Sequence, residues 1–231
     1  LSDVMTGLYA AIGILSALHH REKTGEGQLV DAALLDCSVA SLVNIAQYYL
    51  TSGKIAPRLG NAHSTIVPYQ AFATQDSYII VSIGNDGQFQ RFCNAGGHPE
   101  WAEDVRFSKN SQRVVHREEL VPMIDRLMRT KTTQEWMDIL HDNNIPGAPV
   151  QTMDQVFEMP QIQDRHMEIK MSHPATDREI SLVGSPLKLS GTPVSYREPP
   201  PQLGQHTEEI LANILKLTPE RIEELKKNGT I

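Results

Sequence analysis

The sequence predicts a mixed fold of helices and strands that includes a small α+β domain, from three observations. Residues 4–18 form an uncharged, mainly apolar run that favours a buried helix. From residue 68 onward, two short β-rich runs flank a turn, which is typical of a hairpin. Helical and extended patterns then alternate as far as a proline-rich stretch at 193–204, which predicts a semi-rigid connection.

The first predicted helix begins near Asp3 and ends at Gly25 and Gly27. Its apolar residues lie on nearly every side, so we expect other segments to bury it. The apolar run 4–18 is shorter than the roughly 20 residues that cross a bilayer. It also lacks the basic segment that precedes the apolar part of a signal peptide. We therefore expect a core helix rather than a membrane span.

Asp3 is a lone carboxylate at the start of this helix. The helix dipole favours an anion there, and an ionised, partly desolvated carboxylate is a competent nucleophile. In the alternative interpretation, Ser2 or Asp3 only caps the amides of the first turn. Position alone leaves both interpretations open.

The rest of the chain divides by composition. A second helix is predicted over residues 31–49, and it is followed by a stretch rich in Gly, Lys, Pro, Arg and Asn that predicts a linker. After the small domain and the proline-rich stretch, helices are predicted at 206–215 and from Thr218 onward, with Pro219 at the first helical position. The predicted segments are 1–50 (helical, with Asp3), 51–67 (linker and active-site loop), 68–190 (small α+β domain) and 191–231 (proline-rich linker and C-terminal helices).

The small domain has the alternation expected of an α+β fold and a usual size of roughly 120 residues. Thr132 or Thr133, followed by Glu135, predicts a capped helix start. The predicted strands are 69–74, 78–83, 150–151, 167–171 and 179–183, with the last two flanking a turn at His173–Pro174. The predicted helices are 87–95, 111–129, 133–143 and 153–159.

Composition excludes several classes of protein. The net charge is −7, and the longest basic cluster is Lys226–Lys227, which argues against nucleic acid or an anionic membrane as the main partner. Cys37 and Cys93 suit free thiols in a reducing compartment. The nine histidines lack ligand spacing with Cys or carboxylates, so no metal site is predicted. We expect an intracellular protein, cytoplasmic or, in a eukaryote, mitochondrial.

Short motifs follow one another along the whole chain. They are Leu1-Ser2-Asp3, Lys23-Thr24-Gly25-Glu26-Gly27-Gln28, Gly60-Asn61-Ala62-His63, Pro68-Tyr69-Gln70-Ala71-Phe72, Ile145-Pro146-Gly147-Ala148-Pro149, Gly184-Ser185-Pro186 and Gly204-Gln205-His206-Thr207. In these motifs the sequence resembles the class III coenzyme A (CoA) transferases, the family of formyl-CoA transferase and the carnitine dehydratase-like proteins, over essentially all of its 231 residues. The resemblance implies an α/β fold with a small α+β domain. The segment 62–70 is most similar to the dicarboxylate type, which uses succinate and hydroxymethylglutarate.

The resemblance implies a covalent mechanism at Asp3. In the family, the matching aspartate attacks an acyl-CoA, forms an acyl-aspartyl anhydride and becomes an aspartyl-CoA thioester before the acceptor acid takes the CoA. CoA is then a substrate rather than a permanent cofactor, and the partners are an acyl-CoA and a small carboxylic acid. The family also implies an interlocked homodimer. Because members begin with a large nucleotide-binding half, we expect this chain to be a C-terminal part with a partial class III fold, inactive alone.

The loop before Pro68 departs from formyl-CoA transferase, in which a run of glycines closes over the active site. His63-Ser64-Thr65-Ile66 replaces the glycines here, so lid motion of that kind is not expected. In the functional interpretation, loop side chains hydrogen-bond a substrate carboxylate, with Arg58 as a bidentate partner. In the alternative, His63 caps the turn and Arg58 is solvated. The predicted substrate-binding residues are Arg58, Gly60, Asn61, His63, Ser64 and Thr65.

Two further functions remain open. α-Methylacyl-CoA racemases share the family fold and the aspartate, which they use with an upstream histidine to transfer a proton. A non-catalytic homologue that only dimerises would need no nucleophile. Other polar motifs are interpreted as structural: Asn85–Asp86 as a turn and helix cap, and Trp101 and Trp136 as packing residues.

Overall fold

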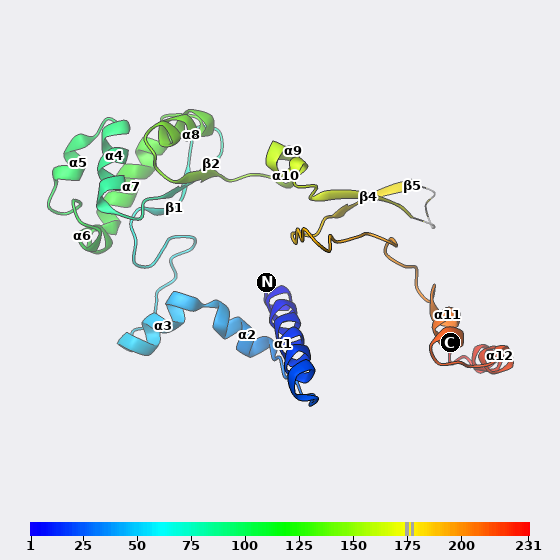
Figure 1. Ribbon diagram of the computed structural model, residues 1–231. Helices are drawn as coiled ribbons and strands as arrows, with labels where there is room; N and C mark the ends of the chain where they lie inside the picture. Colours follow the sequence, from blue (N-terminus) through cyan, green and yellow to red (C-terminus); the bar gives the residue numbers. More distant parts are fainter. Residues whose placement is uncertain (174–175, 177) are drawn as a thin grey trace. The chain divides into compact units, whose positions relative to one another are not determined.

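The computed structural model describes residues 1–173, 176 and 178–231 (Figure 1). The chain divides into two compact units, residues 1–150 and 151–231, which we describe separately. This division falls inside the segment 68–190 that the sequence predicts as one small domain. The four predicted segments describe domains of the complete protein, so their boundaries stay a prediction.

Helices α1 (Ser2–Thr24), α2 (Leu34–Ser41) and α3 (Val43–Ser52) open the first unit. The predicted end of the first helix is confirmed. Gly25 adopts a left-handed conformation with φ 80°, which glycine tolerates best, and its amide donates to the carbonyl of Arg21 (2.8 Å). The predicted second helix is instead two helices that meet at Leu42.

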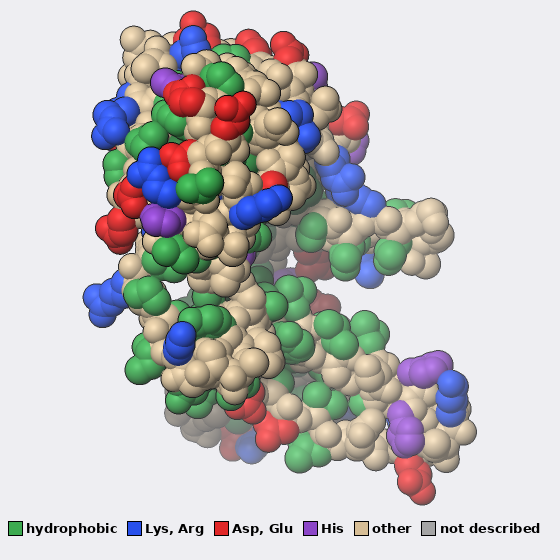
Figure 2. All heavy atoms as spheres, turned by 90° about the vertical axis from the view of Figure 1, so that its left-hand side faces the viewer, with side chains coloured by type: hydrophobic (Ala, Val, Ile, Leu, Met, Phe, Trp, Pro, Cys, Tyr) green, Lys and Arg blue, Asp and Glu red, His purple; other side chains and the backbone are tan. Residues whose placement is uncertain are grey.

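The expectation that α1 is buried is wrong for the residues that the structure describes. No residue of α1 is buried, and Val4, Ile12 and Leu15 are each at least 60% exposed. A helix that is apolar on all sides needs neighbours on several sides, and in the described part of the chain α2 is the main element that packs along it. Figure 2 shows hydrophobic side chains on the surface of the part with α1–α3, and charges of both signs on the part with α4–α8. Within the described residues, none of the helices combines the length and hydropathy needed to span a bilayer.

A three-stranded antiparallel sheet forms the centre of the first unit, with strand order β1-β2-β3. The predicted hairpin is confirmed as β1 (Tyr69–Ala73) and β2 (Tyr78–Ser82). The third strand, β3 (Gly147–Pro149), lies just before the predicted strand at 150–151. The amide of Val150 still donates to Tyr78 (2.9 Å), so the sheet pairing extends to the predicted position.

Helices follow the sheet largely where the sequence predicts them. The predicted helix 111–129 is broken at His116, and the short α5 was not predicted. The predicted capping box of α8 is confirmed, because the Thr132 amide donates to Glu135 Oε2 (2.8 Å) and the Glu135 amide donates to Thr132 Oγ1 (3.3 Å). The helices are α4 (Asp86–Ala95), α5 (Pro99–Glu103), α6 (Asn110–Val115), α7 (Arg117–Met128) and α8 (Thr133–Asp142).

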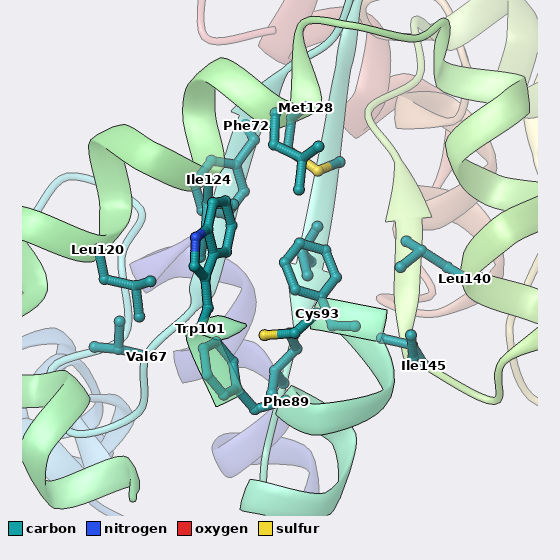
Figure 3. Packing of buried hydrophobic residues seen from close by; sticks show 14 of the residues in the cluster. Val67, Phe72, Phe89, Cys93, Trp101, Leu120, Ile124, Met128, Leu140 and Ile145 are labelled. Carbon is teal, nitrogen blue, oxygen red and sulfur yellow. The ribbon is translucent and has the colours of Figure 1, made fainter. Parts of the chain in front are cut away.

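The hydrophobic core of the first unit lies between these helices and the sheet (Figure 3). Trp136 is 0% exposed, and its Nε1 donates to the carbonyl of Met128 (2.7 Å). Trp101 is 8% exposed, so both tryptophans pack as predicted. The core continues through Phe72 and Phe89 to the loop at Val67.

The second unit contains a confirmed two-stranded hairpin, in which Met171 pairs with Ile180. Its predicted turn at His173–Pro174 lies partly outside the described residues. The last helix begins at Pro219, and Thr218 Oγ1 accepts a hydrogen bond from the Arg221 amide (3.4 Å). The elements are α9 (Met153–Glu158), α10 (Pro160–Asp164), β4 (Glu168–His173), β5 (Arg178–Val183), α11 (Thr207–Asn213) and α12 (Pro219–Lys227).

Candidate active site

Asp3 lies exposed in the first turn of α1. The N-cap position is Leu1, and no side chain caps the helix, so the interpretation of Ser2 or Asp3 as a cap is wrong. The Ser2 hydroxyl instead accepts a hydrogen bond from Ser38 on α2 (3.0 Å). Within the described part of the chain, no hydrogen bond or ion pair engages the Asp3 carboxylate. Its oxygens are therefore open to a ligand, and the helix dipole favours their negative charge.

The loop 60–67 is held in a defined shape next to β1. Gly60 has φ 61°, a left-handed conformation that favours glycine. Asn61 Oδ1 accepts a hydrogen bond from the Ala71 amide on β1 (3.0 Å), which ties the loop to the sheet. No hydrogen bond or ion pair in the described residues joins the loop to Asp3.

His63 caps its own turn, as the alternative interpretation predicted. Its Nδ1 accepts a hydrogen bond from the Thr65 amide (3.2 Å), and its ring stacks on Tyr69 with 5.3 Å between centroids. An accepting Nδ1 places the proton of the neutral ring on Nε2. His63 can therefore cap the turn and still offer an Nε2–H donor to a ligand. The hydroxyls of Ser64 and Thr65 make no hydrogen bond within the described residues.

Arg58 lines a shallow pocket beside the loop, with a volume of about 310 Å³. Arg117 lines the same pocket, and neither guanidinium forms an ion pair within the described residues. Glu118 lines the same pocket, so a carboxylate bound there would meet one acidic side chain beside the two guanidinium groups. The sequence analysis did not single out Arg117. The other lining residues include Ala62, Gln70 and Val121.

Arg113 supports the loop from inside the core. It is 0% exposed, donates from Nε to the Val67 carbonyl (2.6 Å) and pairs through Nη1 with Asp86 (3.0 Å). Its guanidinium lies over the Phe89 ring, 4.4 Å from the centroid. The sequence analysis also missed Arg113 and Asn110. The signal that could have found them is the spacing of 110, 113 and 117, which places three polar side chains on one side of a helical segment.

Burial is the largest single influence on the pKa of Arg113 and on that of Asp86. It lowers the pKa of Arg113, and Asp86 partly offsets that effect. Burial also raises the pKa of Asp86, but the hydrogen bonds from Arg113 and from the Asn110 amide (2.9 Å), with the attraction of Arg113 and Lys109, lower the Asp86 pKa overall. Asn85 caps α4 by accepting from the Gln88 amide (2.9 Å), so the structural interpretation of both residues is confirmed.

Asp86→Asn is expected to lower the free energy of unfolding by about 1–2 kcal/mol at pH 7, a value reduced because Asp86 is partly exposed. The pKa of Asp86 is lower in the folded state, so its contribution is present above the unfolded pKa of about 3.9 and is lost as pH falls below it. Urea unfolding is measured from pH 7 to pH 3. The difference in free energy of unfolding between the Asp86→Asn variant and the unaltered protein should shrink below about pH 4. Glu103→Gln, at an exposed carboxylate, is the control. A difference that does not change with pH would contradict the charge pair.

The cysteines offer no alternative nucleophile. Cys37 and Cys93 are free and buried. Burial raises the pKa of the Cys93 thiol to about 12, so this thiol stays protonated and unreactive near neutral pH. Among the described residues, no group of three or more His, Cys, Asp or Glu side chains is arranged to hold a metal ion.

Comparison with known proteins gives one consistent result. The model of CoA-transferase family III matches residues 1–207. A succinyl-CoA:glutarate CoA-transferase from Homo sapiens is 37% identical over 231 residues, which is 100% of this chain and 52% of the relative. A succinate–glutarate CoA-transferase from Agrobacterium fabrum is 37% identical over 215 residues, 93% of this chain and 53% of the relative.

The fold has a counterpart among solved structures. A CaiB/BaiF family protein from Brucella suis superposes with a TM-score of 0.73 and 36% sequence identity, covering 92% of this chain and 55% of that protein. The chain thus spans about half the length of the curated relatives it matches.

Proposed function

Since the chain belongs to CoA-transferase family III, as the sequence resemblance predicted, we propose that the complete protein transfers CoA from an acyl-CoA to a carboxylic acid. The observation that carries the proposal is the open carboxylate of Asp3. The motif resemblance matches Asp3 to the family aspartate, which supports the proposal. The relatives reported above are named as CoA-transferases, which favours transfer over the racemase alternative. The interlocked homodimer is a proposal from the family resemblance.

In the proposed reaction, the covalent intermediates at Asp3 conserve the free energy of the thioester bond. Its carboxylate attacks the acyl-CoA carbonyl and expels the CoA thiolate, which leaves an acyl-aspartyl anhydride. The thiolate then attacks the aspartyl carbonyl and releases the original acid, so Asp3 becomes an aspartyl-CoA thioester. The acceptor carboxylate attacks the carbonyl of this thioester and expels the CoA thiolate, which leaves a second anhydride between the acceptor and Asp3. The thiolate finally attacks the acceptor's carbonyl, which forms the new acyl-CoA and restores Asp3.

Both intermediates react with water, so the reaction requires a dry site. The exposed apolar residues of α1 around Asp3 fit a helix that other segments of the complete protein cover. The 231-residue chain without those segments is then expected to transfer no CoA.

We propose that the loop 60–67 and Arg58 bind the carboxylates of the acids. His63 Nε2–H and the hydroxyls of Ser64 and Thr65 are donors without a partner in the described residues, and Arg58 lines an adjacent pocket. Carboxylates prefer such donors. Two relatives are named for succinate or succinyl-CoA and glutarate, which supports dicarboxylic substrates for this protein as well.

Hydroxylamine trapping tests the proposed function. The complete protein is incubated with succinyl-CoA, treated with hydroxylamine and digested. Hydroxylamine cleaves an activated aspartyl group, so the peptide containing Asp3 should carry a hydroxamate. Asp36 provides a matched control, because it is also an acid in the first turn of a helix and should stay unmodified.

The other outcomes distinguish the alternatives. CoA transfer without a modified Asp3 would contradict the covalent mechanism. Solvent deuterium entering an α-methylacyl-CoA beside its thioester carbonyl, without any adduct, would favour the racemase. A protein that shows neither activity would be the non-catalytic homologue.

A further inference from the structure

Two buried or half-buried side chains hold the end of the loop 60–67 through its backbone. Asn110, at the start of α6, donates from Nδ2 to the Thr65 carbonyl (2.8 Å) and accepts at Oδ1 from the Val67 amide (3.1 Å). Arg113, one helical turn later, donates to the Val67 carbonyl (2.6 Å). Thr65 and Val67 therefore have their backbone groups bound from the helix side.

Arg117, at the start of α7, holds the middle of the same loop. Its Nη2 donates to the carbonyls of His63 (3.1 Å) and Ser64 (3.0 Å). Hydrogen bonds from a charged donor are stronger than neutral ones. Among the carbonyls from residue 63 to residue 67, only that of Ile66 has no side-chain donor in the described part of the chain.

This arrangement has a chemical consequence for an anionic ligand. Carbonyl oxygens are acceptors with partial negative charge, so they repel a carboxylate. Arg113 and Arg117, which are cationic, and the neutral amide of Asn110 bind these oxygens and fix their direction. Within the described residues, the loop side chains keep donors unoccupied: the Nε2–H of His63 and the hydroxyls of Ser64 and Thr65.

We propose that Asn110, Arg113 and Arg117 form a loop anchor of positioning residues for CoA transfer. They bind the loop backbone and so keep the donors of His63 and its neighbours in a fixed geometry for the acceptor carboxylate. This inference rests on the proposed function of the loop. Displacing substrate-binding groups by about 1 Å can reduce a rate by about 10²-fold, so the anchor should be visible in kinetics.

Arg117 gives the sharpest test, because it is half-buried and its removal leaves the buried Arg113–Asp86 pair intact. In the complete protein, with saturating acyl-CoA and varied acceptor acid, Arg117→Ala should lower kcat/KM for the acceptor by about 10- to 100-fold, mainly through KM. Arg117→Lys should recover part of the loss, because an ammonium group also donates to carbonyls.

Arg126→Ala is the matched control. Arg126 lies on the same helix, is exposed, and has no hydrogen bond or ion pair within the described residues. Amide hydrogen exchange provides a second measurement. Exchange of the loop amides should be faster in Arg117→Ala and unchanged in Arg126→Ala. Faster exchange with normal acceptor kinetics would show that Arg117 serves only the fold, and would overturn the proposal.

A second variant keeps the test decisive if Arg117→Ala does not fold. Asn110→Asp keeps an acceptor for the Val67 amide but replaces the donor to the Thr65 carbonyl with a repelling oxygen. It should also raise the acceptor KM, and an unchanged KM would overturn the proposal. If the unaltered protein transfers CoA and the variants match it in acceptor kinetics and in amide exchange, the loop anchor is refuted and the proposed function stands. An unaltered protein without CoA transfer refutes the proposed function and this inference with it.

Discussion

Replacement of Asp3 by alanine in the complete protein is expected to lower kcat for CoA transfer by at least about 10⁴-fold, because no other group at this position can form the anhydride. The side chain is exposed and makes no hydrogen bond within the described residues, so the fold should be unaffected. The measurement is the steady-state rate of CoA transfer to a dicarboxylic acid. Circular dichroism checks that the variant is folded.

The control is Asp36→Ala, because both acids lie in the first turns of helices that pack together. Asp36→Ala should retain at least half of the activity, which excludes a general effect of removing a charge there. Asp3→Asn, of nearly equal size, should be as inactive as Asp3→Ala. If either Asp3 variant keeps more than a tenth of the rate, Asp3 is not the nucleophile.

Trp136→Ala is expected to destabilise the first unit by about 3–5 kcal/mol. The substitution leaves a cavity in the core and removes the buried hydrogen bond from Nε1 to the Met128 carbonyl. Trp136→Phe should cost less, because an aromatic ring remains beside Phe92, whose ring centroid is 6.5 Å from that of Trp136. Urea unfolding followed by far-UV circular dichroism measures both losses.

Val105→Ala is the control for this substitution. Val105 is 81% exposed, so its variant should stay within about 0.5 kcal/mol of the unaltered protein. An equal, small loss in Trp136→Ala and Val105→Ala would mean that the described core is not the structure in solution.

Local chemistry explains which elements could be predicted from the sequence. Gly25 ends α1 and the Thr132–Glu135 pair opens α8 through contacts between residues that are neighbours in the chain. The break at His116 has no such local signal, since neither glycine nor proline stands there. The burial of α1 depends on groups far away in sequence or on other segments, so an apolar pattern alone could not decide it.

The candidate site also contains residues that the sequence indicated and residues that it did not. Asp3 was found by its match to family motifs, and its position on a helix added little. Arg113 and Arg117 were missed because charged residues in a helical pattern usually predict a solvated face. Which of several arginines lies inside the core depends on tertiary packing, here on the Val67 and His63 carbonyls that these side chains meet.

Under the proposed mechanism, the exposed apolar surface of α1 couples assembly of the complete protein to catalysis. Most of the stability of a helix in a protein comes from packing of its apolar face, and α1 has α2 as its main neighbour in the described part of the chain. The segment that presents Asp3 then depends for its rigidity on surfaces supplied by the complete protein. Dilution or mild denaturant that separates those surfaces would then fray α1 and abolish CoA transfer, while the hydrophobic core around Trp136 stays folded.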